Sequence, residues 1–129
     1  MSPELALVLW ALVLFEVKHF ICDFALKRRY SKSKRNYGNR IDLLHAGVHA
    51  LGSLPAILVL TASPALIASI AAAESVAHYH LDWFKGWIVK RRALGYDDRL
   101  YWILFGADQL GHQLTYVIIL AVLARAAGL

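Results

Sequence analysis

The sequence predicts an all-α integral membrane protein, a four-helix bundle that forms a single transmembrane domain over residues 1–129. Hydrophobic residues make up 59% of the chain, and the mean hydropathy of +0.50 is too high for a soluble domain of this size. Charged residues make up 18% and cluster in two stretches, so helix faces elsewhere have no polar surface to present to water. The apolar stretches are rich in Ala and Leu without alternation, which favours helices over strands.

Four apolar segments approach the roughly 20 residues that a helix needs to cross a bilayer. They cover residues 4–26, 43–62, 64–88 and 100–126. The first and third also contain charged residues, but these crowd one end and leave residues 5–15 and 65–73 uncharged. The link between the second and third segments predicts a tight hairpin, with Ser63 as helix N-cap and Pro64 in the first helical position.

Two basic loops predict the orientation. Loop 27–41 contains seven basic residues, and loop 89–99 contains four more beside Asp97 and Asp98. Two helices separate these loops, so they lie on the same side, and the positive-inside rule makes that side cytoplasmic. The expectation is therefore an N-out, C-out protein with several spans in a cell membrane, the bacterial inner membrane. We expect the lipid bilayer, and not nucleic acid, to be the partner of the basic residues.

Each predicted helix carries two metal-capable side chains four residues apart, which places both on one helix face. The pairs are His19 and Asp23, His45 and His49, His78 and Asp82, and Asp108 and His112. Ionisable groups in lipid-embedded helices are costly and usually face a functional interior. The directions of the helices predict two layers in the cytoplasmic half of the bundle. His19, His49, His78 and His112 form the deeper layer, and Asp23, His45, Asp82 and Asp108 the shallower one.

Five imidazoles and three carboxylates predict a site for one or two divalent ions such as Zn, Mn or Fe. Eight candidates exceed one tetrahedral set, so some would orient ligands or move protons, with Asp108 or Asp82 as the general base. Neighbours that could support them are Glu16, Asp42, Glu74, Gln109 and Thr115. His80 is expected to point away from His78, and Lys85 to lie near the cytoplasmic mouth. A metal-free core of hydrogen-bonded polar residues is the structural alternative.

Four short motifs resemble the bacterial membrane family catalogued as domain of unknown function 3307. They are His19-Phe20-Ile21-Cys22-Asp23-Phe24, His45-Ala46-Gly47-Val48-His49, His78-Tyr79-His80-Leu81-Asp82 and Asp108-Gln109-Leu110-Gly111-His112. The resemblance covers almost the whole chain and implies a small membrane protein with several spans. Its His/Asp motifs also resemble those of membrane-bound metal-dependent hydrolases. The family often has glycine before the first aspartate, where this chain has Cys22.

The leading interpretation is a metal-dependent hydrolase acting on a lipid or lipid-linked substrate, for example an anionic phospholipid. The alternatives are non-catalytic metal binding or divalent-cation transport, haem binding, and a non-enzymatic scaffold. Transport would need a polar route to the outer side, which residues 5–15 and 117–124 do not offer. Haem would leave the three carboxylates without a role.

Overall fold

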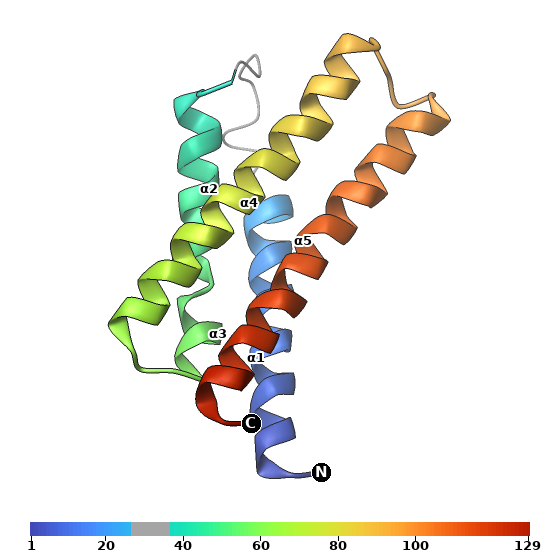
Figure 1. The fold of residues 1–129 in the computed structure, drawn as a ribbon. Helices are drawn as coiled ribbons and strands as arrows, with labels where there is room; N and C mark the ends of the chain where they lie inside the picture. Colours follow the sequence, from blue (N-terminus) through green and yellow to red (C-terminus); the bar gives the residue numbers. More distant parts are fainter. Residues whose placement is uncertain (27–36) are drawn as a thin grey trace.

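The computed structural model describes residues 1–26 and 37–129, and all regular structure within them is helical. The elements in chain order are α1 (Pro3–Phe20), the π-helix η1 (Ile21–Leu26), α2 (Arg40–Gly52), α3 (Leu54–Leu58), α4 (Pro64–Arg91) and α5 (Arg99–Ala127). Figure 1 shows them as a bundle with both chain termini at one end, which we call the terminal end. The start of α2 and the link between α4 and α5 lie at the opposite end, the loop end.

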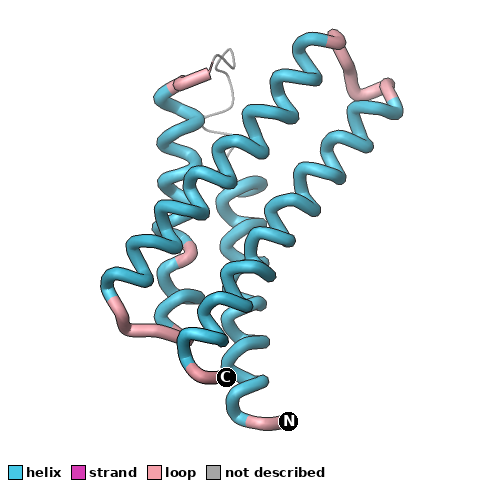
Figure 2. The backbone as a smooth tube through the Cα atoms, viewed as in Figure 1, coloured by secondary structure: helices cyan, strands magenta, loops and turns pink. Residues whose placement is uncertain are grey.

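The second predicted helix is the one that needs correction. Residues 43–62 were expected to form one helix, whereas α2 ends at Gly52, α3 ends at Leu58, and Ser53 separates them. Together α2 and α3 form one column of the bundle, and α1 with η1, α4 and α5 form the other three. Figure 2 shows the interruption as a short loop between α2 and α3. Pro55 has no N–H to donate to the carbonyl one turn back, so the helix cannot continue undisturbed. At the break, Ser53 donates both its backbone N–H and its hydroxyl to the His49 carbonyl, at 3.0 and 3.1 Å.

The hairpin between α3 and α4 is as predicted. The Ser63 side chain accepts a hydrogen bond from Leu66 N at 3.4 Å, and Pro64 occupies the first helical position of α4. This arrangement satisfies one of the backbone N–H groups that a helix start leaves unpaired. The two columns therefore lie antiparallel, which brings the His/Asp pairs of α2 and α4 to the same level.

The distribution of polar residues is the reverse of that in a soluble protein. Large apolar side chains are exposed, among them Trp10 (64%), Leu51 (68%) and Ile118 (64%), while eleven polar or charged residues are buried in the described part of the chain. Three stretches, Pro3–Leu26, Arg40–Leu58 and Arg99–Ala127, are long and apolar enough to cross a membrane. These features are those of a membrane protein, because only lipid makes such a surface favourable.

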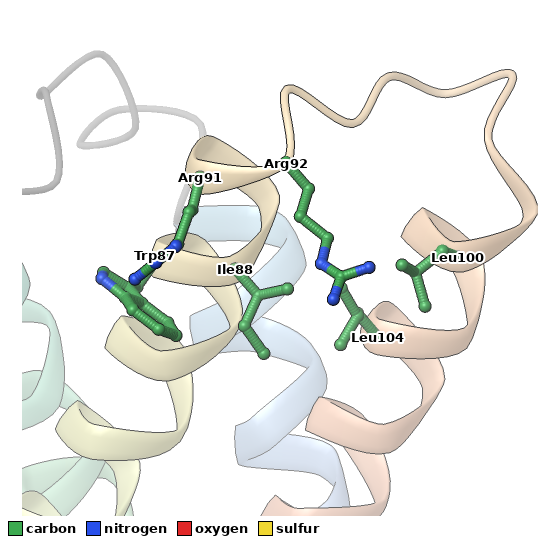
Figure 3. A pocket seen from close by; sticks show the side chains of 6 residues that line it. All are labelled: Trp87, Ile88, Arg91, Arg92, Leu100 and Leu104. Carbon is green, nitrogen blue, oxygen red and sulfur yellow. The ribbon is translucent and has the colours of Figure 1, made fainter.

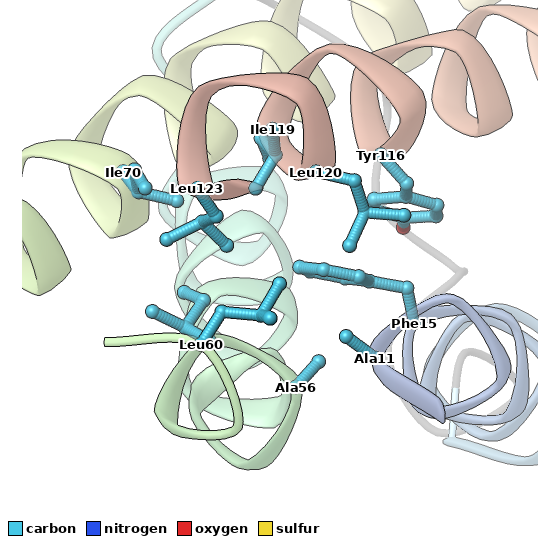
Figure 4. Close-up of a cluster of buried hydrophobic side chains, with 10 residues drawn as sticks. Ala11, Phe15, Ala56, Leu60, Ile70, Tyr116, Ile119, Leu120 and Leu123 are labelled. Atoms are coloured by element: carbon cyan, nitrogen blue, oxygen red, sulfur yellow. The ribbon is translucent and has the colours of Figure 1, made fainter. Parts of the chain in front are cut away.

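An apolar cluster fills the bundle at its terminal end (Figure 4). At its centre the rings of Phe15 and Tyr116 stack with centroids 5.1 Å apart. Its other members are Ala11, Ala56, Ile57, Leu60, Ile70, Ile119, Leu120 and Leu123. The buried histidines and carboxylates occupy the helix segments on the loop side of this cluster, so the bundle core is divided into an apolar and a polar half.

Candidate metal centre

Asp23 lies at the centre of the polar half, in a segment where the helix changes from α to π. The π-helix Ile21–Leu26 replaces the regular α-helix directly after Phe20, and such turns are frequent at functional sites. The Oδ1 atom of Asp23 lies 3.0 Å from Nε2 of His45, 3.2 Å from that of His49 and 3.9 Å from that of His78. A single carboxylate thus contacts imidazoles from α2 and α4.

The four imidazoles of the deeper layer form a contiguous group. The ring centroids of His49 and His78 are 3.7 Å apart, and those of His78 and His112 are 4.1 Å apart, both in stacked geometry. His19 lies beside them, with its centroid 5.2 Å from that of His112. His45 is one turn nearer the loop end, 4.7 Å from His49. The five predicted histidines therefore lie together in the bundle interior.

Asp82 and Asp108 line the α4–α5 side of the same interior. The Oδ2 atom of Asp82 lies 3.6 Å from His45 Nε2, and the Oδ1 atom of Asp108 lies 3.6 Å from His112 Nε2. Lys85 pairs with both carboxylates, at 3.2 Å from Asp82 Oδ1 and in a short contact with Asp108 Oδ2. Lys85, which was expected near the cytoplasmic mouth, turns its ammonium group inward to these two carboxylates.

Two groups of donor atoms have the spacing that a metal ion requires. They are Asp23, His45, His49 and His78, and His78, Asp82 and His112, and within each group the atoms lie within 4.8 Å of one another. All six residues are buried, and His78 belongs to both groups. The structure therefore brings six of the eight predicted ligands into metal-binding spacing and places the other two, His19 and Asp108, directly beside them.

His19 has a hydrogen-bond partner at each ring nitrogen. Its Nε2 donates to Gln109 Oε1 and its Nδ1 accepts from the Tyr116 hydroxyl, both at 3.0 Å. The side-chain amide of Gln109 also donates to Asp23 Oδ2 at 3.4 Å and to Asp108 Oδ2 at 3.3 Å. Gln109 is thus more central than its sequence position suggested, since it links His19 to two carboxylates.

Several buried polar atoms of the site have no hydrogen-bond partner. Within the described residues they include Nε2 of His49, His78 and His112 and Oδ1 of Asp108. Each lies 3.2 to 3.9 Å from a site group of complementary type without hydrogen-bond geometry. A buried unsatisfied group costs about 1–3 kcal/mol, and coordination of a cation in the first donor group would satisfy the Nε2 atoms of His49 and His78. The donor set therefore fits a divalent metal.

The carboxylates of the site carry more negative charge than its lysine balances, and a bound cation would neutralise the excess. Asp23, Asp82 and Asp108 contribute three negative charges and Lys85 one positive charge, so two negative charges remain when the histidines are neutral. Uncompensated charge is expensive in a low-dielectric interior. One divalent ion would balance it.

Two glycines allow the helices to approach closely at the site. A Cβ atom on Gly111 would lie 2.9 Å from Leu81 Cδ2, so glycine at this place in the last motif lets α5 approach α4. A Cβ atom on Gly52 would lie 3.4 Å from Cys22 Sγ. Cys22 therefore packs against a glycine of α2.

A second polar network was not anticipated from the sequence. Lys18 is buried and pairs with Glu74, donates to the His49 carbonyl at 3.3 Å, and lies 3.4 Å from His49 Nδ1. Ser53 Oγ donates to Glu74 Oε1 at 2.8 Å. Glu74, a candidate to support the ligands, is the partner of this lysine from another helix. The sequence offered one signal for this pair. Lys18 and Glu74 carry opposite charges and lie on the terminal side of the histidine layer, in the first and third predicted segments.

The remaining candidates lie away from the centre. His80 is on the outer face, as expected, where its Nδ1 donates to the Val76 carbonyl at 2.7 Å. Thr115 donates to the Gly111 carbonyl of its own helix at 2.9 Å. Glu16 and Asp42 are half-buried.

The comparisons with known proteins give a family but no function. The family model described as "Protein of unknown function (DUF3307)" matches residues 11–127. Neither the curated proteins nor the solved structures contain a match to this chain. The matched range includes all eight predicted site residues and nearly the whole bundle. The chain therefore belongs to the DUF3307 family.

Proposed function

We propose that all four columns cross the membrane, with the loop end in the cytoplasm and both termini outside. The start of α2 and the α4–α5 link lie at the same end of the bundle (Figure 1), which supports the expectation that both basic loops lie on one side of the membrane. α4, the least apolar column, turns Glu74 and Asp82 inward and exposes apolar residues such as Val76 (59%) and Phe84 (55%). Its outer face therefore suits lipid, and the basic residues at the loop end favour the cytoplasmic side.

We infer that the polar core binds one divalent metal ion, with Asp23, His45, His49 and His78 as the main ligands. The buried nitrogen and oxygen atoms without partners carry this inference. The excess negative charge supports a single ion. His78 belongs to both donor groups, and its Nε2 offers one lone pair, so the groups compete for it. Mixed imidazole and carboxylate ligands suit Zn, Mn or Fe.

The chemistry that we propose is hydrolysis of an ester in a lipid or lipid-linked substrate. A divalent ion would supply Lewis acidity toward the ester. Asp108 is the better candidate for the base, because its Oδ1 has no hydrogen-bond partner while Lys85 holds its Oδ2. Asp82, which contacts His45 and His78, is better placed to orient ligands. We assign His19 to orientation as well, because both its nitrogens are engaged.

Two alternatives are less well supported by the geometry. Haem would need room between imidazoles, whereas His49, His78 and His112 stack 3.7 and 4.1 Å apart. Transport would need a polar path through the terminal end, which the apolar cluster around Phe15 and Tyr116 fills. Non-catalytic metal binding uses the same residues, and activity measurements separate it from hydrolysis.

Elemental analysis of protein purified in detergent without chelators tests the metal proposal, with one bound divalent ion per chain expected. Protein that stays metal-free after loading and removal of excess ions would contradict it. Hydrolase activity is tested separately with phospholipid and lipid-linked esters, before and after chelation. Turnover that requires the metal and is lost in Asp108→Asn supports catalysis, and turnover that survives chelation contradicts it.

A further inference from the structure

A cleft of about 620 Å³ opens between the end of α4 and the beginning of α5 at the loop end. The residues that line it are Trp87, Ile88, Arg91, Arg92, Leu100 and Leu104. Figure 3 shows the Arg92 side chain reaching into the cleft, between Ile88 on α4 and the two leucines on α5. The cleft therefore combines apolar walls with a guanidinium group inside it.

Arg92 has no ion-pair partner among the residues that the structure describes. The nearby Asp98 is turned to its own loop, where its Oδ2 accepts a hydrogen bond from Gly95 N at 2.7 Å. Arg91 adds a second positive charge and lies over the Trp87 ring, 5.2 Å from its centroid. The Arg92 guanidinium, which has no carboxylate partner within the described residues, is suited to a phosphate, which accepts paired hydrogen bonds from arginine.

The position of the cleft indicates that the phosphate belongs to a lipid. Trp87 (40% exposed) and Trp102 (55%) are exposed near it, as expected of an interfacial aromatic belt. Beside the Arg92 guanidinium, Ile88, Leu100 and Leu104 present only hydrocarbon to the cleft. A free phosphate would leave these walls unused, whereas an amphiphile would place its head group on Arg92 and its apolar part against them. Basic pockets between membrane helices bind anionic lipids in this manner.

We propose that the α4–α5 cleft binds an anionic phospholipid, with its phosphate on Arg92 and its apolar part on Ile88, Leu100 and Leu104. The proposal does not depend on a metal in the bundle core, because none of these residues belongs to the donor groups.

Lipid retention by protein in neutral detergent tests the proposal, measured by native mass spectrometry with phosphatidylglycerol and phosphatidylcholine as probes. Arg92→Gln removes the guanidinium inside the cleft, and Leu100→Trp fills the cleft. Lys90→Gln is the control, because it removes an exposed charge next to Arg91 that does not line the cleft. Salt is kept high enough to screen diffuse attraction.

Wild-type protein should retain phosphatidylglycerol in preference to phosphatidylcholine. Arg92→Gln should lower this retention by about tenfold or more, the scale of a lost charge-assisted hydrogen bond. Leu100→Trp should also lower it, and Lys90→Gln should stay within about twofold of wild type under screening salt. Added inorganic phosphate should not displace the lipid.

Equal retention by wild type and Arg92→Gln would overturn the proposal. An equal loss in Lys90→Gln and Arg92→Gln would do the same, because it would indicate diffuse attraction to the loop end. Displacement by inorganic phosphate would overturn the lipid assignment. If Arg92→Gln does not fold, Leu100→Trp decides: loss of retention supports the cleft, and wild-type retention refutes it. Metal content, measured in the same samples, should be unchanged in all three variants.

Discussion

Replacing Asp23 with asparagine tests the metal centre at the residue that contacts most of its ligands. The substitution keeps the shape of the side chain and removes one of the three negative charges. Asp23 Oδ1 lies between 3.0 and 3.9 Å from Nε2 of His45, His49 and His78. A cation held by these nitrogens would lie about 4 Å or less from the carboxylate, where two unit charges interact by about 4 kcal/mol at an effective dielectric constant of about 20. A divalent ion interacts about twice as strongly, so metal affinity should fall by at least roughly a thousandfold.

The assay is a competition titration of detergent-solubilised protein with a metal-binding dye, together with elemental analysis. Asp97→Asn is the control, because Asp97 is an exposed carboxylate in the α4–α5 link and should leave affinity unchanged. Near-UV circular dichroism establishes that the variant is folded, since buried polar networks also contribute to stability. Wild-type affinity in folded Asp23→Asn would refute the assignment of Asp23 as a ligand and the charge-balance reasoning with it.

Three further predictions address the site, the second network and the topology. His112→Ala should lower metal affinity by about 10- to 100-fold, the range for residues that ligate a metal or orient its ligands. His80→Ala, on the outer face of α4, should leave affinity unchanged. A metal titration in which only His80→Ala loses affinity would show that the inner and outer helix faces are misassigned. Lys18→Met or Glu74→Gln should each destabilise the bundle by about 3–5 kcal/mol, and a double variant with methionine at both positions should recover most of this loss; unfolding titrations in detergent that give additive losses would contradict a buried ion pair. A reporter fused to the C-terminus should respond from the outer side, and one inserted into residues 27–36 from the cytoplasm; a cytoplasmic C-terminus would refute the orientation.

The His/Asp pairs were the most informative feature of the sequence, because their spacing is a local property of a helix. Residues four apart share a face whatever the neighbouring helices do. All four predicted helices carry such a pair. The directions of the helices were therefore enough to predict that the pairs face one interior and lie at similar depth in the bundle. The same rule predicted the position of His80. It follows His78 by two residues, so its side chain points to another face of the helix.

What the sequence did not reveal depends on contacts between helices. Lys18 and Glu74 are 56 residues apart, and no local spacing links them. Lys85 resembled an interfacial cation until its carboxylate partners on α4 and α5 were known. The roles of Gln109 and Tyr116 likewise depend on the position of His19 in a neighbouring helix.

The backbone irregularities are a second class of feature that the pattern did not predict. The π-helix around Asp23 has no composition that distinguishes it from a continuing α-helix. The break at Ser53 had a visible cause in Pro55, but a proline kinks many membrane helices without ending them, because side chains can satisfy the freed groups. Loop 27–41 falls largely outside the described residues, so its predicted role in orientation stays a prediction from its charge.

The division of the core into two halves limits how the site can be reached. At the terminal end, Phe15, Tyr116 and Leu123 are fully or almost fully buried in apolar packing, which offers no partner to a hydrated ion or a polar head group. Toward the loop end, the row Leu100, Leu104 and Asp108 on one face of α5 leads from the basic cleft to the carboxylate paired with Lys85. A metal ion or a substrate head group would therefore approach from the loop end. This asymmetry is what a site that acts at one membrane surface requires, whereas a transporter would have to open the apolar half in every cycle.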